Sequence, residues 1–321
     1  MKQFFAIVFG GLFFIGAGMG VAYVAGWAWR NAGVLADIKA PSIAAVADAI
    51  IGQPVDGTSV SGFKRIIRYT ADEEEDLISS APQAMKNSAA GGVTARGYIV
   101  KNLTKNSTVI SHNAEIVMPI ASLTKLVTAA VARKLVKPNS RITVTRDIMT
   151  TYGNTAQFRV GEAFLAQDLY YPLLMVSSND AAEALARDYG RLQFIQAMND
   201  FTQSIGAYRT YFADPSGLSP ENVSTANDIA IILDWIRRND PDLIGITMLK
   251  SKTVKGHTWV NPTHFLNWST YLGGKNGYIP EAGLTSASLF SLGPSKNVYA
   301  IVLLDSSSRD GDELRLMEKV K

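Results

Sequence analysis

Segments that alternate apolar and polar residues stand at both ends of the region from residue 93 onward, and helical patterns fill its middle. Residues 95–102 and 107–113 are two such segments separated by a short polar stretch, which predicts a β-hairpin. Strand patterns return near the C-terminal end at residues 275–278, 286–292 and 298–305. A short helix at residues 311–320 closes the chain. This order predicts an α+β fold, with one antiparallel sheet assembled from both chain ends and flanked by helices.

Residues 118–136, MPIASLTKLVTAAVARKLV, carry a serine and a lysine one helical turn apart. Apolar residues recur in this stretch at helical spacing: Leu123, Leu126, Val127, Ala130, Val131 and Leu135. We therefore expect a buried amphipathic helix with Ser122 in its first turn. Residues three apart project from one helix face, so the Lys125 ammonium can reach the Ser122 hydroxyl in an apolar setting.

Such a pair suits covalent catalysis, but its spacing alone proves little. A serine hydroxyl is a weak nucleophile until a neighbour takes its proton. Lysine can do so only when burial or nearby positive charge lowers its pKa. Taken alone, S-x-x-K more often marks a serine cap followed by an unrelated surface lysine, so the motif has to be weighed with the rest of the chain.

The N-terminal residues 4–29 carry no charge, and the run is long enough to span a bilayer. Lys2 precedes it and Arg30 follows it, while Trp27 and Trp29 suit an interfacial belt. We expect residues 1–30 to be an uncleaved signal anchor, with the rest of the chain extracytoplasmic. A cleaved signal peptide is the alternative, although its apolar core is ordinarily only about 7–15 residues long.

Residues 31–92 lose clear periodicity and are rich in Gly, Ser, Pro and Ala near their middle and end, which predicts a juxtamembrane linker. Residues 93–321 then make one ordinary domain. The chain has no cysteine, so neither a disulfide framework nor a thiol site is available. Its net charge of +3 is dispersed along the sequence, and we expect no nucleic-acid partner.

Two further motifs follow the serine and lysine in a fixed order. Ser177-Ser178-Asn179 begins 55 residues after Ser122, and Lys275-Asn276-Gly277 begins 98 residues later again, on a predicted strand. Each has an ordinary explanation by itself: a helix N-cap for Ser177 or Asn179, and an edge-strand charge for Lys275. Together, S-x-x-K, S-x-N and K-x-G resemble the serine acyltransferases that include penicillin-binding proteins and serine β-lactamases.

The flanking sequence extends this resemblance from about Thr94 to the C-terminus. Four blocks carry it: PIASLTKLVTA, VGEAF..QDLYYPLLMVSSNDAAEALA, MND.T..IGAYRTYFADPSGLSPEN.STANDIA and GGKNGY.PEAG. These blocks look like the D-alanyl-D-alanine carboxypeptidase family. The resemblance implies a β-lactamase/transpeptidase-like fold and penicillin binding.

The resemblance also implies catalytic roles for five residues. Ser122 would attack the carbonyl between two D-alanines, and Lys125 would accept its proton. Ser177 would relay a proton to the leaving amine with the help of Lys275. Asn179 would hold the substrate amide and Lys125 in place.

Substrate-binding roles follow for the strand and its surroundings. Gly277 would let the substrate approach the strand backbone. The oxyanion would bind the backbone N–H groups of Ser122 and Tyr278. Arg309, after the last strand, would contact the terminal carboxylate, since its guanidinium suits that group. Arg315 is the weaker candidate.

The strand motif departs from the family pattern. The family has K-T-G-x-T where this chain has K-N-G-Y-I, so both threonine hydroxyls are lost at Asn276 and Ile279. In the family these threonines help to bind the substrate carboxylate. The Asn276 amide can also donate a hydrogen bond, whereas the Ile279 side chain cannot.

Other chemistries lack support. The histidines His112, His257 and His264 have no G-x-S-x-G partner and no acidic partner at a plausible spacing, so we expect neither a histidine triad nor a metal, and no cofactor. Glu162 precedes S-x-N, whereas the deacylating glutamate of a class A β-lactamase follows it, so we expect slow deacylation of penicillin. Residues 215–217, Pro-Ser-Gly, read as a turn.

We therefore expect a membrane-anchored, extracytoplasmic serine D-Ala-D-Ala carboxypeptidase that trims peptidoglycan stem peptides and is inhibited by β-lactams. Two alternatives stay open. One is an endopeptidase or transpeptidase of altered specificity, which Asn276 and Ile279 make plausible. The other is a catalytically weak homologue that binds cell-wall peptide as a scaffold.

Overall fold

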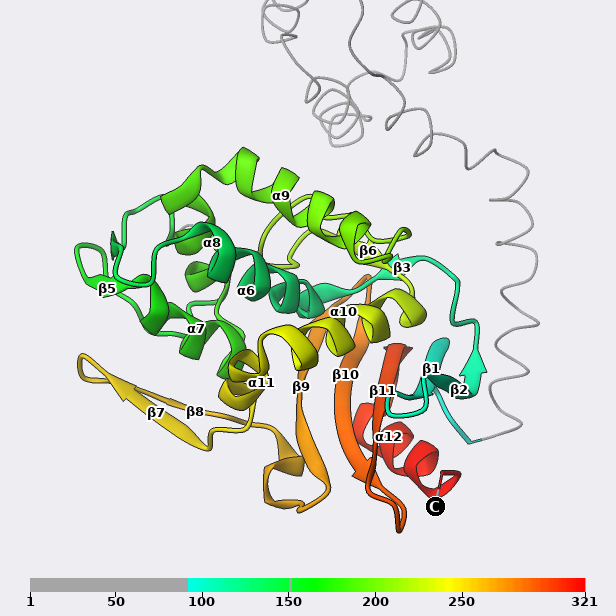
Figure 1. Cartoon of the computed structure of the whole chain (residues 1–321). Helices are drawn as coiled ribbons and strands as arrows, with labels where there is room; N and C mark the ends of the chain where they lie inside the picture. Colours follow the sequence, from blue (N-terminus) through cyan, green and yellow to red (C-terminus); the bar gives the residue numbers. More distant parts are fainter. Residues whose placement is uncertain (1–91, 150–151, 321) are drawn as a thin grey trace, which may run out of the picture. The chain divides into compact units, whose positions relative to one another are not determined.

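The computed structural model describes residues 92–149 and 152–320 (Figure 1). These residues all belong to one compact unit of the chain, Ala71–Lys321. The predicted anchor at residues 1–30, and all but the last residue of the predicted linker, lie outside the described residues. Within the described ranges, no helix combines the length and the apolar character that a bilayer crossing needs.

A five-stranded antiparallel sheet in the order β2-β1-β11-β10-β9 forms the base of the fold. Its strands are β1 (Gly97–Asn102), β2 (Ser107–His112), β9 (Tyr271–Ile279), β10 (Gly283–Leu292) and β11 (Asn297–Ser306). The predicted hairpin is confirmed as β1 and β2, and β1 pairs with β11 from the other end of the chain. The prediction of one sheet built from both chain ends is therefore correct. Strand β9 begins at Tyr271, four residues before Lys275, where the sequence predicted its start.

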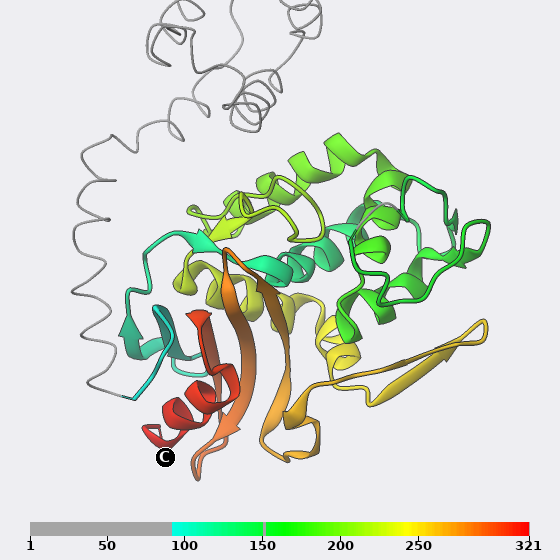
Figure 2. The same cartoon turned by 180° about the vertical axis from the view of Figure 1, so that it is seen from behind.

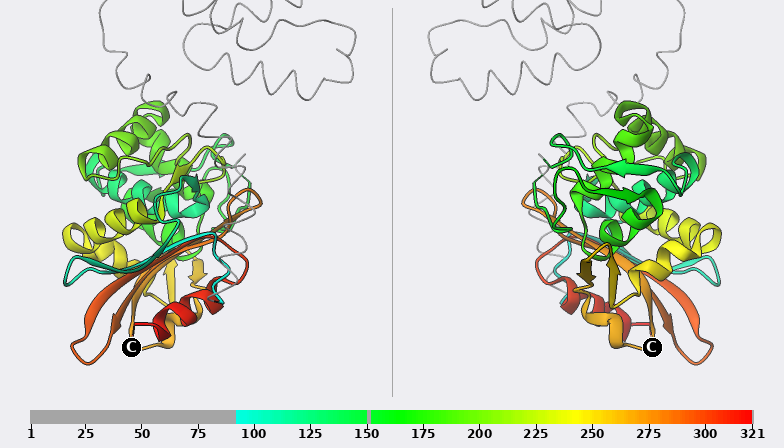
Figure 3. Two further views of the ribbon diagram at one scale, coloured as in Figure 1. Left: turned by 90° about the vertical axis from the view of Figure 1, so that its right-hand side faces the viewer. Right: turned by 90° about the vertical axis from the view of Figure 1, so that its left-hand side faces the viewer.

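Side-chain alternation gives the sheet two apolar faces. Ala287, Leu289 and Val302 belong to the larger hydrophobic core, and Phe290 and Ile301 belong to a second core on the opposite face. The closing helix α12 (Arg309–Glu318) covers this second face, and the other helices lie across the sheet from it (Figure 3). The sheet is thus buried on both sides, which explains the nearly continuous apolar run in β11.

The helical layer surrounds one central helix, α6 (Thr124–Leu135), which contacts four others (Figures 1 and 2). These are α7 (Ala166–Met175), α8 (Asn179–Tyr189), α9 (Arg191–Ser204) and α10 (Ala226–Asn239). A short helix, α11 (Pro241–Thr247), follows α10. The helical patterns in the middle of this region are thus confirmed as helices. Thr225 caps α10 by accepting the backbone N–H of Asp228 at 3.0 Å.

The start of the central helix differs from the prediction. Residues Met118–Pro119 form a short strand, β3, paired with β6 (Val223–Ser224), and a 3₁₀ turn, η2 (Ala121–Leu123), precedes α6. Ser122 therefore lies in the 3₁₀ turn and not in the first α-helical turn. Pairing with β6 holds the chain extended up to Pro119, and helical geometry can begin only after it.

A projecting hairpin and two small strands were not assigned from the sequence. The hairpin consists of β7 (Ser251–Val254) and β8 (His257–Val260). Trp259 attaches it to the loop before β5, because its indole N–H donates to the Ala156 carbonyl at 3.0 Å. A 3₁₀ turn, η3 (His264–Asn267), then leads into β9. Strands β4 (Arg141–Thr143) and β5 (Ala163–Leu165) pair beside α7.

The Glu313 carboxyl under the sheet should make stability depend on pH. It is 1% exposed and accepts a hydrogen bond from Ser288 Oγ at 2.7 Å, and burial raises its pKa from 4.5 to about 7. Because the folded state binds this proton more tightly, stability should fall as pH rises from 4.5 through 7, by about 3 kcal/mol in all. Glu313→Gln should therefore unfold at a higher temperature than the parent at pH 8 and not at pH 5. Equal shifts at both pH values would contradict this assignment.

Candidate active site

The serine and lysine of the first motif meet at the junction of η2 and α6. Lys125 Nζ lies 2.9 Å from Ser122 Oγ, and the Lys125 side chain is fully buried. Ala121, directly before the serine, has φ of +50°, a left-handed conformation that costs an alanine energy. Thr124 Oγ1 donates to the Ala121 carbonyl at 2.8 Å and helps to hold this conformation. The predicted serine–lysine contact is present.

The Lys125 amine has two further partners. Asn179 Oδ1 accepts from it at 2.7 Å and the Ser216 carbonyl at 2.5 Å. Burial, and next the positive charge of Lys275, hold the pKa of Lys125 well below its usual 10.5, although Asp214 and Asp180 oppose this shift. A neutral amine is a proton acceptor, so these surroundings suit a general base.

The second motif lies in the turn between α7 and α8. Ser177 has φ of +58°, another left-handed conformation. The N-cap of α8 is Ser178, whose Oγ accepts the Ala181 backbone N–H at 3.1 Å, so neither Ser177 nor Asn179 serves as the cap. Asn179 Nδ2 donates to the Tyr152 carbonyl at 2.5 Å, which fixes its Oδ1 toward Lys125.

The third motif brings β9 to the same place. Lys275 Nζ donates to Ser177 Oγ at 3.0 Å and to its neighbour's carbonyl, Asn276 O, at 2.6 Å. Its side chain is buried, and burial, followed by the Arg309 charge, lowers the pKa of Lys275 to about 7. The three motifs thus meet as two pairs, Ser122 with Lys125 and Ser177 with Lys275. Asn179 joins them as a further partner of Lys125, and the Lys275 charge acts on Lys125.

Strand β9 approaches the serine very closely at Gly277. A Cβ atom added to this glycine would stand 2.7 Å from the Ser122 nitrogen and 2.6 Å from Thr285 Oγ1. Thr285, opposite Gly277 in β10, donates to the Ile120 carbonyl at 3.1 Å and so ties the sheet to the start of the serine turn. Gly277 thus permits close packing of β9 against the serine turn. That it also lets a substrate approach the strand backbone stays a prediction.

The remaining predicted residues lie at the edge of this cluster. Tyr278 follows Gly277 and is 62% exposed. Asn276 is half-buried and stands opposite Ser286 in β10. Arg309 begins α12, pairs with Asp310 at 3.1 Å and acts electrostatically on Lys275.

Arg315 and the histidines have other partners. Arg315 pairs with Asp312 at 3.1 Å. His257 pairs with Glu162 at 3.1 Å and His264 with Asp310 at 2.5 Å. The statement that the histidines have no acidic partner is therefore wrong for these two, because the partners come from distant parts of the sequence. In the described part of the chain, no cluster of three potential ligands is arranged for a metal ion.

A cavity of about 570 Å³ lies between the β7–β8 hairpin and residues 154–162, and it contains none of the predicted site residues. The sequence also missed two participants in the serine–lysine cluster, Tyr152 and Ser216. Both contribute a main-chain carbonyl. Such a contribution leaves no mark on residue type, so only the tertiary structure reveals it.

Comparison with known proteins agrees with this geometry. The sequence profile of a peptidase family described as D-alanyl-D-alanine carboxypeptidase, S11, matches residues 83–305. The chain belongs to the D-alanyl-D-alanine carboxypeptidase family. It is therefore a serine peptidase, and the sequence-based assignment to this family and to the hydrolases is confirmed.

Individual members of the family show how far the similarity extends. A D-alanyl-D-alanine endopeptidase of Escherichia coli is 33% identical over 225 residues, which are 65% of this chain and 71% of the relative. The carboxypeptidase DacB2 of Mycobacterium tuberculosis is 30% identical, and the match covers 65% of this chain and 74% of the relative. A crystal structure of a D-alanyl-D-alanine carboxypeptidase from Mycobacterium tuberculosis superposes with a TM-score of 0.65 at 25% identity, over 71% of this chain and 91% of the other. The predicted penicillin-binding protein fold is thereby confirmed.

In this D-alanyl-D-alanine carboxypeptidase, Gly277→Ala should separate β9 from the serine turn. The new Cβ would meet backbone and Thr285 at under 3 Å, so the strand has to move, and we expect acylation by a fluorescent penicillin to slow about a hundredfold. Gly245→Ala in α11, where no atom lies within 4 Å of the new Cβ, is the matched control and should acylate like the parent. Undiminished acylation of a folded Gly277→Ala enzyme would contradict the assigned packing.

Proposed function

We propose that the chain removes the terminal D-alanine of peptidoglycan stem peptides through an acyl-enzyme on Ser122. Ser122 Oγ bonds to the carbonyl carbon between the two D-alanines while Lys125 Nζ accepts the hydroxyl proton. The C–N bond then breaks, and the leaving amine gains a proton. Water adds to the resulting ester, releases the shortened peptide and returns the proton to Ser122.

The burial of Lys125 and the three contacts of its amine are the observation that carries this proposal. A neutral amine has two hydrogens and one lone pair. Asn179 Oδ1 at 2.7 Å and the Ser216 carbonyl at 2.5 Å can take the two hydrogens. The lone pair is then directed to the third neighbour, the Ser122 hydroxyl at 2.9 Å. This arrangement supports proton transfer from serine to lysine with no rotation of the amine.

Ser177 is proposed to deliver the proton to the leaving amine. Its hydroxyl lies 3.0 Å from Lys275 Nζ, which can donate to it and replenish its proton. The pKa of Lys275, about 7, permits donation near neutral pH. The backbone N–H groups of Ser122 and Tyr278 are proposed to stabilise the oxyanion, and the contact of Gly277 with the Ser122 nitrogen supports their proximity.

Asn276 and Arg309 are proposed to bind the terminal carboxylate. The Asn276 amide can donate one hydrogen bond, and the Arg309 guanidinium supplies the charge. Without the two threonine hydroxyls of the family, this contact relies more heavily on Arg309. A free C-terminal carboxylate is thereby a weaker determinant of binding than in relatives with K-T-G-x-T.

Endopeptidase activity on cross-linked peptides is a second candidate, for two reasons. The Escherichia coli relative, which is named an endopeptidase, is 33% identical to this chain, whereas DacB2, which is named a carboxypeptidase, is 30% identical. The altered strand at Asn276 and Ile279 also weakens recognition of a free terminal carboxylate.

Acylation of Ser122 tests the function directly. Incubation of residues 81–321 with a fluorescent penicillin should add one penicillin to the intact mass, with slow release, because no deacylating glutamate is assigned. Ser122→Ala should remove the adduct and Asp234→Asn, a buried carboxylate on α10, should not. A folded parent that forms no adduct would overturn the proposal.

Turnover on two substrates then separates the candidates. A carboxypeptidase releases D-alanine from the free pentapeptide, and an endopeptidase splits the cross-linked dimer. Faster turnover of pentapeptide supports the main proposal. Faster turnover of the dimer supports the second, and Asn276→Thr should in that case shift the ratio back toward pentapeptide.

We also propose that residues 1–30 anchor the enzyme in the membrane with its domain extracytoplasmic. The uncharged run of residues 4–29 supports this placement. The full chain, expressed in bacteria, should stay in carbonate-washed membranes at its full intact mass and be digested by protease added to spheroplasts. A mass lacking the N-terminal segment would instead identify a cleaved signal peptide.

A further inference from the structure

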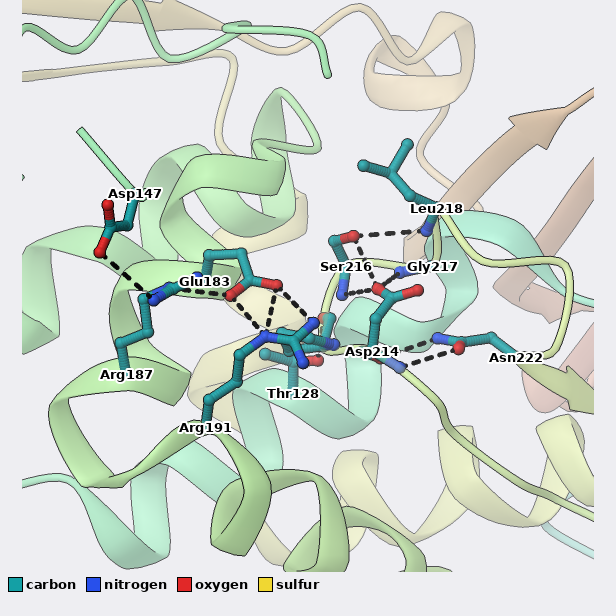
Figure 4. A network of polar contacts seen from close by, with 11 residues as sticks. Thr128, Asp147, Glu183, Arg187, Arg191, Asp214, Ser216, Gly217, Leu218 and Asn222 are labelled. Atoms are coloured by element: carbon teal, nitrogen blue, oxygen red, sulfur yellow. Dashed lines mark hydrogen bonds and ion pairs between the residues drawn. The ribbon is translucent and has the colours of Figure 1, made fainter. Parts of the chain in front are cut away.

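The turn from Asp214 to Leu218 is organised by one buried carboxylate (Figure 4). Asp214 is 8% exposed, and its two oxygens accept four hydrogen bonds. The donors to Asp214 are the Ser216 N–H at 2.6 Å, the Ser216 hydroxyl at 2.7 Å, the Gly217 N–H at 2.7 Å and the Ser219 N–H at 2.7 Å. A carboxylate with this many donors fixes the path of the turn.

The same turn is docked on the first turns of α6. The Pro215 carbonyl accepts from Thr128 Oγ1 at 2.6 Å, and the next carbonyl, of Ser216, accepts from Lys125 Nζ at 2.5 Å. Gly217 packs so tightly that a Cβ there would lie 2.0 Å from the Ala121 carbonyl oxygen. The turn therefore touches both the lysine and the residue before the nucleophile.

Asn222 closes the back of the turn. Its Oδ1 accepts the backbone N–H groups of Ala213 and Asp214 at 2.9 and 3.1 Å. Its Nδ2 donates to the Asp214 carbonyl at 2.8 Å and to Thr124 Oγ1 at 3.0 Å. The side chains of Asp214 and Asn222 thus both hydrogen-bond to the turn, and the Ser216 carbonyl has little freedom to leave Lys125.

We propose that Asp214 is a positioning residue for Lys125: by fixing the Ser216 carbonyl and placing its charge nearby, it sets both the orientation and the basicity of the lysine amine. This inference rests on the proposed role of Lys125 as the base. The Ser216 carbonyl takes one of the two amine hydrogens, so its position decides where the lone pair points. If the turn shifts, the lone pair no longer faces Ser122.

The charges that act on Lys125 come from several elements. Lys275 on β9 lowers the pKa of Lys125, whereas Asp214 in the turn and Asp180 on α8 raise it. Behind the turn, Arg191 on α9 is held by Glu183 on α8 at 2.9 Å, so this cation is compensated (Figure 4). Removing the Asp214 charge should therefore lower the pKa of Lys125 further.

Asp214→Asn tests the two parts of the proposal in one pH profile. The acylation rate of Ser122 by a fluorescent penicillin should rise with pH as Lys125 loses its proton. In Asp214→Asn this acidic limb should move to lower pH by about half a unit or more, since a carboxylate charge is lost. The plateau rate should fall about tenfold or more, because the amide NH₂ cannot accept the fourth hydrogen bond and the turn shifts.

Two further variants separate charge from geometry. Asp214→Glu keeps the charge and displaces the carboxylate. The acidic limb of its pH profile should therefore stay in place while its plateau rate of acylation falls. Asp228→Asn is the matched control. Asp228 is another buried carboxylate that accepts a backbone N–H, from Arg209 at 2.7 Å, and a hydroxyl, from Thr210 at 3.0 Å, and this change should alter neither limb nor plateau.

A purely structural role would lower the Asp214→Asn rate equally at every pH, and an unshifted limb would overturn the proposal. Should this variant fail to fold, Thr128→Val decides, because it keeps the Asp214 charge and removes the hydroxyl whose shortest contact, at 2.6 Å, anchors the turn to α6 at the Pro215 carbonyl. Its plateau should fall severalfold with no shift of the limb, and an unchanged plateau would overturn the positioning role. Absence of acylation in the parent enzyme would instead count against the proposed function itself.

Discussion

The arrangement of the candidate active site depends on the burial of one amine. Around Lys125 lie η2, the start of α8, the turn at Asp214 and β9, and each of these elements contributes a partner or a charge. An ammonium group in this position would have to be removed from water, which is costly, so burial lowers the pKa of Lys125. The helical layer thereby holds an amine that already contacts Ser122, Asn179 and the Ser216 carbonyl. Since these partners come from distant segments, this environment exists only when the whole domain has folded.

The sheet and the helices meet at the serine turn, and the close contacts there explain its backbone strain. Gly277 of β9 and Gly217 of the Asp214 turn approach Ala121 and Ser122 from two directions, and a side chain at either glycine would collide with them. Ala121 and Ser177 both adopt left-handed conformations next to reactive groups. Such conformations persist only where the surrounding packing imposes them. The strain therefore belongs to the site and not to a single loop.

Lys275 connects this centre to the far side of the sheet. Its amine reaches Ser177 at 3.0 Å, and its pKa responds to Arg309 at the start of α12. Helix α12 also buries Glu313, whose pKa is raised to about 7. The chain thus places ionisable groups with shifted pKa values on both faces of the strands near β9. The altered residues Asn276 and Ile279 belong to β9, the same strand as Lys275.

Sequence patterns were enough to predict the α+β class, the pairing of both chain ends in one sheet, the helical middle of the region, and the motif residues Ser122, Lys125, Ser177, Asn179 and Lys275. Periodicity and motif order can be read from a linear sequence because they depend on residue type and spacing alone. That Ser122 lies in a 3₁₀ turn followed only from the three-dimensional structure, because pairing between β3 and β6 delays the helix. The three-dimensional structure also decided the roles of the Ser216 and Tyr152 carbonyls and the pairing of His257 with Glu162. Main-chain groups carry no residue signature, and contacts between segments nearly a hundred residues apart arise only from packing.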